Sequence, residues 1–209
     1  MIRILIADDH AVVRKGLKQI LFDDFPSCEI EEVSNTEELI LKVMKSNFDV
    51  VISDLSMPGR SGMEALQYIK QHYPKLPVLI LSMHAEEHYA LRVLKAGASG
   101  YLGKDSASTE LVKAVNRVLL GKKYITSTIA EKLASSLDRD SDKLPHEYLS
   151  DREFEVLKML ANGKSVSDIA ELLTLSITTV STYRARIMSK MNLKTNADLT
   201  LYAVQHKLI

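Results

Sequence analysis

The sequence predicts an α/β doubly wound, five-stranded parallel sheet followed by an all-α domain of four helices. Two observations lead to this fold class. Short apolar runs alternate with segments of helical spacing up to Gly121, and from Leu149 onward every periodic segment is helical. A length of 209 residues is enough for two small domains. The hydrophobic share of 46% and charged share of 26% are typical of folded globular chains.

The first half of the chain contains five short runs that predict strands. They cover residues 4–6, 30–33, 50–52, 78–81 and, more weakly, 100–102. Between them, spacings such as that of Val13, Leu17 and Leu21 predict helices. The runs are continuous rather than alternating, so we expect helices on both faces of the sheet.

A charged, turn-forming stretch over residues 138–145 predicts a linker, and the spacing within 126–137 predicts a short helix before it. We therefore expect a domain over residues 1–122, a short helix and linker over 123–148, and a second domain over 149–209.

Four helices are predicted in the second half. Ser150 and Glu153 form a capping box at the start of the first, which runs through Ala161 and ends at Gly163. The others cover residues 166–173, 177–191 and 195–206, with a tight turn over 174–176 between the second and the third.

Composition excludes several classes of protein. The 27 basic and 27 acidic residues balance, so the net charge does not favour binding to nucleic acid or to a membrane surface. Any such binding has to depend on a local cluster of charge. The single cysteine, Cys28, excludes an internal disulfide and a cysteine metal cluster. No apolar run is longer than four residues, so we expect no membrane span and a cytoplasmic protein.

Polar residues follow four of the predicted strands: Asp8, Asp9, Asp54, Ser82 and Lys104. Ligands of an open parallel sheet bind at the carboxyl ends of its strands, so we expect these side chains to converge. Clustered carboxylates repel one another unless a cation joins them, and oxygen ligands favour Mg²⁺. Asp54 is then a candidate nucleophile that forms an acyl phosphate, with Mg²⁺ and Lys104 neutralising charge and Ser82 hydrogen-bonding a phosphoryl oxygen.

These residues lie in motifs that resemble the receiver domain of two-component response regulators, a flavodoxin-like fold. The motifs are Ala-Asp-Asp-His at 7–10, Ser-Asp-Leu-Ser-Met-Pro-Gly at 53–59, Leu-Ser-Met at 81–83 and Gly-Tyr-Leu-Gly-Lys-Asp at 100–105. The resemblance implies Asp54 as phosphoacceptor, Asp9 and Asp54 as Mg²⁺ ligands with the Ser56 backbone carbonyl, and Asp8 as a ligand through water. It also implies that Ser82 and Tyr101 form the switch pair beside Lys104.

Two residues depart from that pattern. Asp105 stands where many receivers have proline, and Gly103 stands where related chains have a larger apolar residue. A glycine weakens a strand, so we expect looser coupling between the site and the output surface. Taken alone, Tyr101 is predicted to be a half-buried strand aromatic.

The third helix of the second domain has the pattern of a helix that enters the major groove. At about 100° per residue, Val180, Ile187 and Met191 share its buried side. The opposite face is small and polar, and no acid lies between Glu171 and Asp198. The predicted DNA-binding residues are Ser181, Thr182 and Ala185 at base edges, Thr178 on the same face, and Arg186, Lys190 and, more weakly, Arg184 at phosphates.

Residues 149–209 resemble a LuxR-type helix-turn-helix domain, and the two domains together resemble the NarL/FixJ family of transcriptional regulators. The resemblance implies phosphorylation of Asp54 by a sensor histidine kinase, control of binding to double-stranded promoter DNA, and a homodimer when phosphorylated. Helix 195–206 either serves dimerisation or closes the four-helix core.

We expect no enzyme activity beyond slow autodephosphorylation. Two alternatives stay open: a phosphorylation-independent DNA-binding regulator, and a Mg²⁺-dependent phosphatase with an aspartyl-phosphate intermediate. Such a phosphatase needs a second aspartate two residues after the first, and here Ser56 holds that position.

Overall fold

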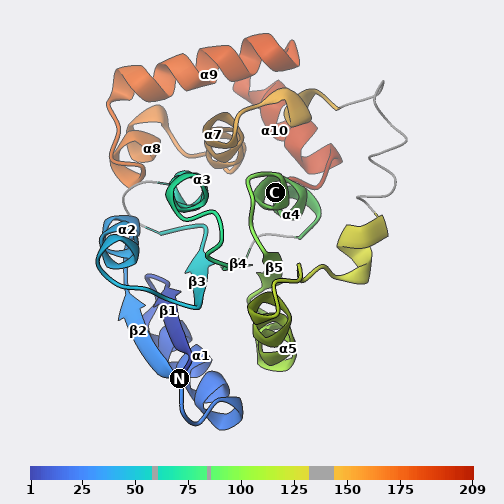
Figure 1. Ribbon diagram of the computed structural model, residues 1–209. Coiled ribbons are helices and arrows are strands. Elements are labelled where there is room, and N and C mark those ends of the chain that lie inside the picture. Colours follow the sequence, from blue (N-terminus) through green and yellow to red (C-terminus); the bar gives the residue numbers. More distant parts are fainter. Residues whose placement is uncertain (58–60, 84–85, 132–143) are drawn as a thin grey trace. The chain divides into compact units, whose positions relative to one another are not determined.

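The chain forms two compact units, Met1–Ala134 and Ser135–Ile209 (Figure 1). The computed structural model describes residues 1–57, 61–83, 86–131 and 144–209. Within these residues, each helix is too short or too polar to pass through a bilayer.

The N-terminal unit contains the predicted parallel sheet. Its strands are β1 (Arg3–Ala7), β2 (Glu29–Val33), β3 (Val50–Asp54), β4 (Val78–Ser82) and β5 (Gly100–Gly103). All neighbours pair in parallel, in the order β2-β1-β3-β4-β5. Every residue of β3 and β4 is buried, as their continuous apolar runs predict. The doubly wound fold class is thereby confirmed.

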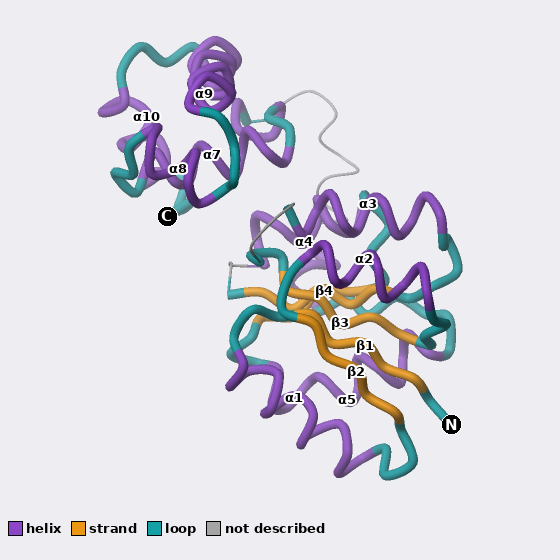
Figure 2. Tube along the Cα trace, turned by 90° about the vertical axis from the view of Figure 1, so that its left-hand side faces the viewer, coloured by secondary structure: helices purple, strands orange, loops and turns teal. Residues whose placement is uncertain are grey.

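Helices cover both faces of this sheet (Figure 2). On one face lie α1 (Ala11–Asp24) and α5 (Ala107–Leu119), and on the other α2 (Thr36–Lys45), α3 (Gly62–His72) and α4 (Glu86–Lys95). A core cluster beneath α1 and α5 includes Ile4, Leu21 and Val115, each fully buried. Because all five strands run parallel, their carboxyl ends form one edge of the sheet.

Helix α3 starts unusually close to the end of β3. The Gly62 amide donates a 3.2 Å hydrogen bond to the Leu55 carbonyl. A Cβ at this position would lie 2.6 Å from that oxygen and 2.8 Å from the Asp54 carbonyl oxygen. Glycine is therefore required where α3 meets the segment that follows Asp54.

The chain continues along the edge of the sheet after α5. The Tyr124 amide donates to the Ser99 carbonyl at 2.8 Å, and Tyr124 forms a parallel bridge with Gly100. Its hydroxyl donates to Glu110 Oε2 at 2.5 Å. Residues 127–131 are helical, and the rest of the predicted helix and linker residues 138–143 lie outside the described residues. The segment after the predicted boundary at 122 thus covers part of β5.

The C-terminal unit contains the four predicted helices, α7 (Asp151–Ala161), α8 (Val166–Leu172), α9 (Ile177–Met191) and α10 (Asn196–Gln205). Their bounds match the predicted ones within a residue. The capping box of Ser150 and Glu153 is confirmed, and Gly163 follows α7 with a φ of 80°.

A short 3-10 helix, η1 (Pro145–Tyr148), precedes these four helices. The sequence predicts linker here, but His146 is buried and its Nδ1 lies 2.9 Å from the Tyr202 hydroxyl. The His146 ring also packs against Phe154 at a centroid distance of 6.1 Å. One buried ring in a four-residue segment leaves no periodic pattern, so the sequence does not reveal this packing.

We predict that Gly62→Ala destabilises the N-terminal unit by about 1–3 kcal/mol, because its methyl group has to displace backbone atoms of Asp54 and Leu55. Urea unfolding of the full chain measures the change. Gly16→Ala is the matched control, since a Cβ at this exposed position of α1 has no atom within 4 Å. It should stabilise by about 0.5–1 kcal/mol through helix propensity. Equal effects of the two variants would contradict the close-approach argument.

Candidate functional site

The predicted phosphoryl-site residues lie at the carboxyl edge of the sheet. Asp8 and Asp9 follow β1, Asp54 and Ser82 end β3 and β4, and Lys104 follows β5. The strand register pairs Ser82 with Gly103, and the Lys104 amide donates to the Ser82 carbonyl at 2.9 Å. Parallel pairing thus aligns residues that are far apart in the sequence.

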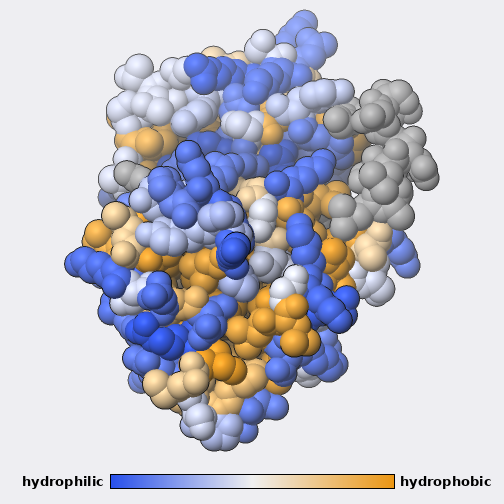
Figure 3. Space-filling view, viewed as in Figure 1, coloured by the Kyte–Doolittle hydropathy of each residue, from blue (hydrophilic) through white to orange (hydrophobic). Residues whose placement is uncertain are grey.

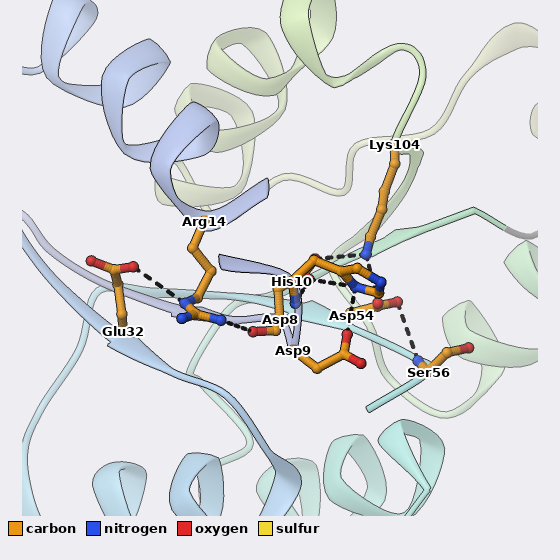
Figure 4. Close-up of polar contacts among 8 residues, drawn as sticks. All are labelled: Asp8, Asp9, His10, Arg14, Glu32, Asp54, Ser56 and Lys104. Carbon is orange, nitrogen blue, oxygen red and sulfur yellow. Dashed lines mark hydrogen bonds and ion pairs between the residues drawn. The ribbon is translucent and has the colours of Figure 1, made fainter. Parts of the chain in front are cut away.

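The ammonium of Lys104 joins two buried carboxylates (Figure 4). Its Nζ lies 2.6 Å from Asp54 Oδ2 and 2.6 Å from Asp8 Oδ2. The side chains of Asp8, Asp54 and Lys104 are 1%, 4% and 8% exposed. Burial would lower the pKa of Lys104, but its contacts with Asp54 and Asp8 outweigh that effect and raise the pKa above the ordinary lysine value. The lysine therefore stays protonated at neutral pH.

His10 and Ser56, which lie in the loops that follow β1 and β3, contact the carboxylates of the cluster. The His10 amide donates to Asp8 Oδ1 at 2.8 Å, and His10 Nδ1 lies 2.7 Å from Asp9 Oδ1. The Ser56 amide donates to Asp54 Oδ1 at 3.2 Å. Asp9, at 30% exposure, is the most accessible of the three aspartates in the cluster.

The residues of this cluster fit a divalent cation. Candidate ligand atoms of Asp8, Asp9, His10 and Asp54 lie within 4.8 Å of one another. Three carboxylates and one ammonium leave a formal charge of −2 (−3 + 1). Asp8 Oδ2 is buried and accepts no well-angled hydrogen bond from the described residues, although it is close to Lys104. Such an oxygen and such a charge both favour a bound cation.

The two residues of the predicted switch pair lie in different places: Ser82 at the carboxyl edge of the sheet and Tyr101 in the core. Ser82 is 1% exposed at the end of β4, whereas Tyr101 lies within β5, paired with Ile80. Tyr101 is 0% exposed, so the expectation of a half-buried ring is wrong. Helices α4 and α5, which lie on opposite faces of the sheet (Figure 2), both contact β5, so the strand is covered on both sides.

The two residues that depart from the receiver pattern contact each other. A Cβ at Gly103 would collide with Asp105 Oδ1, which accepts a hydrogen bond from the Ser106 amide at 3.0 Å. The Asp105 carboxylate thus occupies the space that a larger residue at position 103 would need. The glycine and the aspartate form one local arrangement after Lys104.

The second candidate site is the exposed face of α9. Val180, Ile187 and Met191 are its buried residues, as the angular spacing predicts. Exposed on the other side are Thr178, Ser181, Thr182 and Ala185. Figure 3 shows white to blue surface where α9 lies, so hydrophilic side chains cover the visible face.

The three predicted cations of α9 differ in their contacts. Arg186 is exposed. Arg184 is half-buried and its Nε donates to Asn196 Oδ1 at 2.9 Å. Lys190 Nζ donates to Glu153 Oε2 at 2.7 Å, and the Glu153 side chain is 4% exposed. The sequence does not reveal this ion pair, because it joins residues 37 positions apart.

Glu153 has two functions in the C-terminal unit. It completes the capping box of α7, with Oε2 accepting from the Ser150 amide at 2.8 Å, and it anchors Lys190 of α9. Burial would raise the pKa of Glu153, but the hydrogen bonds from Lys190 and Ser150 outweigh that effect and lower the pKa below the ordinary glutamate value.

Two family models match the chain. Residues 4–116 match the response regulator receiver domain, and residues 147–203 match the bacterial regulatory proteins of the luxR family. The carboxylate cluster lies in the first match and α9 in the second. The fold and the site thus define a response regulator, in which a receiver domain is joined to a LuxR-type output domain.

Relatives of similar length support this classification. The chain is 37% identical over 209 residues to the response regulator UvrY of Escherichia coli (strain K12), covering 100% of this chain and 96% of UvrY. It is 38% identical over 215 residues to the oxygen regulatory protein NreC of Staphylococcus epidermidis, covering 99% of each chain. The chain belongs to the NarL/FixJ family of two-component response regulators.

A solved structure with the same architecture is that of RcsB from Salmonella enterica serovar Typhimurium, bound to promoter rprA in the presence of phosphomimetic BeF3⁻. It has a TM-score of 0.69 and 30% identity, and the match covers 97% of this chain and 98% of RcsB.

The lowered pKa of Glu153 predicts a pH-dependent contribution to stability. A depressed carboxyl pKa stabilises the fold above the unfolded-state value of about 4.3, and this contribution is lost as pH falls through the folded-state pKa. Glu153→Gln should therefore destabilise the C-terminal unit by about 1–3 kcal/mol at pH 7, with the difference from the wild type vanishing in acid. Thermal unfolding of the full chain from pH 3 to 7 measures this.

Glu171→Gln is the control for that experiment, because Glu171 is exposed on α8. It should change stability by less than about 0.5 kcal/mol at every pH. A gap between Glu153→Gln and the wild type that persists unchanged at pH 3 would contradict the assignment of the ion pair.

Proposed function

We propose that this response regulator is a phosphorylation-switched, DNA-binding regulator of transcription, with Asp54 as its phosphoacceptor. The observation that carries the proposal is the Lys104 ammonium, which contacts both Asp54 and Asp8 at 2.6 Å at the sheet edge. Its partner in signalling is a sensor histidine kinase, as membership of a two-component family implies.

In this proposal the Asp54 carboxylate attacks the phosphorus of a phosphohistidine on the kinase. An O–P bond forms, the N–P bond breaks, and the histidine ring leaves with the electron pair of that bond. Lys104 neutralises part of the added negative charge, and the Ser82 hydroxyl donates to a phosphoryl oxygen. Ser82 and Tyr101 then form the pair whose rearrangement marks the phosphorylated state.

Mg²⁺ is the proposed cofactor. Asp9, Asp54 and the Ser56 backbone carbonyl would hold it directly and Asp8 through water, and the bound ion supplies positive charge to the phosphoryl oxygens. The buried Asp8 Oδ2 and the formal charge of −2 support this assignment.

The proposed output is binding of double-stranded promoter DNA by α9. Ser181, Thr182 and Ala185 would face base edges, with Thr178 on the same face and with Arg186, Lys190 and, more weakly, Arg184 near phosphates. Support comes from the exposed polar face of α9 and from RcsB, whose structures include a promoter complex and two dimers bound to two parallel DNAs. We infer that this chain also forms a homodimer when phosphorylated.

Family membership also supports the remaining parts of the proposal. Because the family consists of transcription regulators, we infer that the protein works in the cytoplasm, where the DNA is, and loses its phosphoryl group slowly without turning over a substrate. The predicted domain limits, with a receiver over 1–122 and a DNA-binding domain over 149–209, enclose most of both family matches.

We predict that acetyl phosphate with Mg²⁺ adds one phosphoryl group to the wild-type chain and none to Asp54→Ala, because Asp54 is the carboxylate held by Lys104 at the strand end. Intact-mass spectrometry measures the added mass. A chelator should abolish the labelling, since the clustered carboxylates then repel the incoming phosphate.

Asp105→Ala is the matched control, because Asp105 lies beside Lys104 in sequence but accepts its hydrogen bond locally, from the Ser106 amide. It should be labelled like the wild type. Full labelling of Asp54→Ala would overturn the phosphoacceptor assignment. Steady release of inorganic phosphate would favour the phosphatase alternative.

We predict that Arg186→Ala weakens binding to all DNA sequences alike and reduces the slope of log affinity against log salt by about one unit, because one phosphate contact is lost. Thr182→Val should instead cost about 1–3 kcal/mol at one base position and relax preference there. Salt-titrated binding of the phosphorylated chain to its mapped site and to scrambled DNA separates the two effects.

Two outcomes of the same titration would contradict the proposal. A changed base preference of Arg186→Ala with an unchanged salt slope would show that α9 enters the groove in another orientation. Equal DNA affinity with and without phosphorylation would favour the phosphorylation-independent alternative.

A further inference from the structure

Arg14 contacts the backbone of the loop that carries Asp8 and Asp9. It is the fourth residue of α1, and its Nη1 donates to the Asp8 carbonyl at 2.6 Å. Its own amide donates to the His10 carbonyl at 3.1 Å. The side chain of Arg14 therefore holds the start of the three-residue loop between β1 and α1, while its amide makes the first backbone hydrogen bond of the helix.

This loop has no side-chain cap to fasten it to the helix. His10 occupies the N-cap position of α1 and makes no capping hydrogen bond through its side chain. Side-chain caps occur on α2 and α3, where Asn35 and Ser61 accept from backbone amides. The guanidinium of Arg14 makes a different contact, because it donates to a carbonyl of the loop rather than accepting from an amide of the helix.

The guanidinium is itself fixed from β2 (Figure 4). Arg14 Nε lies 3.3 Å from Glu32 Oε2, and Lys18 Nζ lies 2.6 Å from Glu32 Oε1. Arg14 is 17% exposed and Glu32 29% exposed, so both are partly shielded from water. The planar fork of arginine can reach a carboxylate with Nε while Nη1 bonds a carbonyl, whereas lysine has one nitrogen for both partners.

We propose that Arg14 is a positioning residue for the divalent-cation site: held by Glu32, it fixes the Asp8 carbonyl and thereby the directions of the Asp8 and Asp9 carboxylates. This inference rests on the proposed function, which assigns Mg²⁺ to those carboxylates. Ligand groups have to be held to within about 0.5 Å, and their supporting contacts typically affect metal affinity about tenfold or more. Arg14 acts through the Asp8 backbone.

The test measures binding of Mn²⁺ alone, as a paramagnetic probe of the Mg²⁺ site, by the electron paramagnetic resonance signal of the free ion. Arg14→Lys in the full chain should weaken Mn²⁺ binding about tenfold. The half-saturating Mg²⁺ concentration for labelling with acetyl phosphate should rise by a similar factor, while the rate at saturating Mg²⁺ recovers. A role in stability alone would not produce this split.

Arg3→Lys is the matched control. Arg3 forms a comparable fork at the other end of β1, with Nε 3.1 Å from Glu29 Oε2 and Nη1 donating to the Asn47 carbonyl at 2.7 Å. The control should bind Mn²⁺ like the wild type. Glu32→Gln should weaken binding in the same direction as Arg14→Lys, and the double variant should be no weaker than the stronger single one, because both act through one contact.

The outcomes separate this proposal from the proposed function. Wild-type Mn²⁺ affinity in Arg14→Lys, or equal weakening in Arg3→Lys, would overturn the positioning assignment. Mn²⁺ binding that depends on Arg14 in a chain that takes no phosphoryl group on Asp54 would instead overturn the proposed function alone. Thermal unfolding of each variant identifies any that fails to fold, and Arg14→Lys keeps the charge and most of the side-chain volume.

Discussion

Three carboxylates gather at one edge of the sheet, and the ammonium of Lys104 contacts two of them, those of Asp8 and Asp54. Negative charge therefore exceeds positive charge at this edge. The parallel register sets Asp54 beside Lys104, although 50 positions separate them in sequence. Asp8 and Asp54 are nearly inaccessible to water, so neither is relieved by solvation. Arg14 adds a cation to the Asp8 backbone, on the Glu32 side of the loop. The remaining negative charge is consistent with the proposed divalent ion and with the proposed phosphoryl transfer at this edge.

Sequence patterns predict the fold well because each strand and helix carries its own periodicity. The convergence of Asp8, Asp54 and Lys104 follows from one topological rule about strand ends. Contacts between residues that are distant in the sequence cannot be predicted from it. Two examples are the ion pair of Arg14 with Glu32 and the polar contact of His146 with the Tyr202 hydroxyl. Local propensity carries no information about such pairs. In the sequence, Arg14 and His146 cannot be told apart from an arginine or a linker histidine that has no such partner.

In the C-terminal unit, one carboxylate serves both folding and the proposed recognition surface. Glu153 caps α7 and holds Lys190, a residue of the helix that carries the polar face. A DNA phosphate would have to share the Lys190 ammonium with Glu153, a carboxylate that is only 4% exposed. Arg186 has no such competition from Glu153. In the proposed DNA complex, the cations of α9 would therefore differ in how freely they can reach a phosphate.

The bridge between Tyr124 and Gly100 determines where the receiver unit can be cut. In the strand order β2-β1-β3-β4-β5, β5 is an edge strand, and an uncovered edge presents amides and carbonyls that template pairing between molecules. Tyr124 covers part of that edge through Ser99 and Gly100. A chain shortened to residue 122 would lose this cover while keeping every residue of the carboxylate cluster. Aggregation of such a truncated receiver would then reflect an exposed sheet edge, with the chemistry of the site intact.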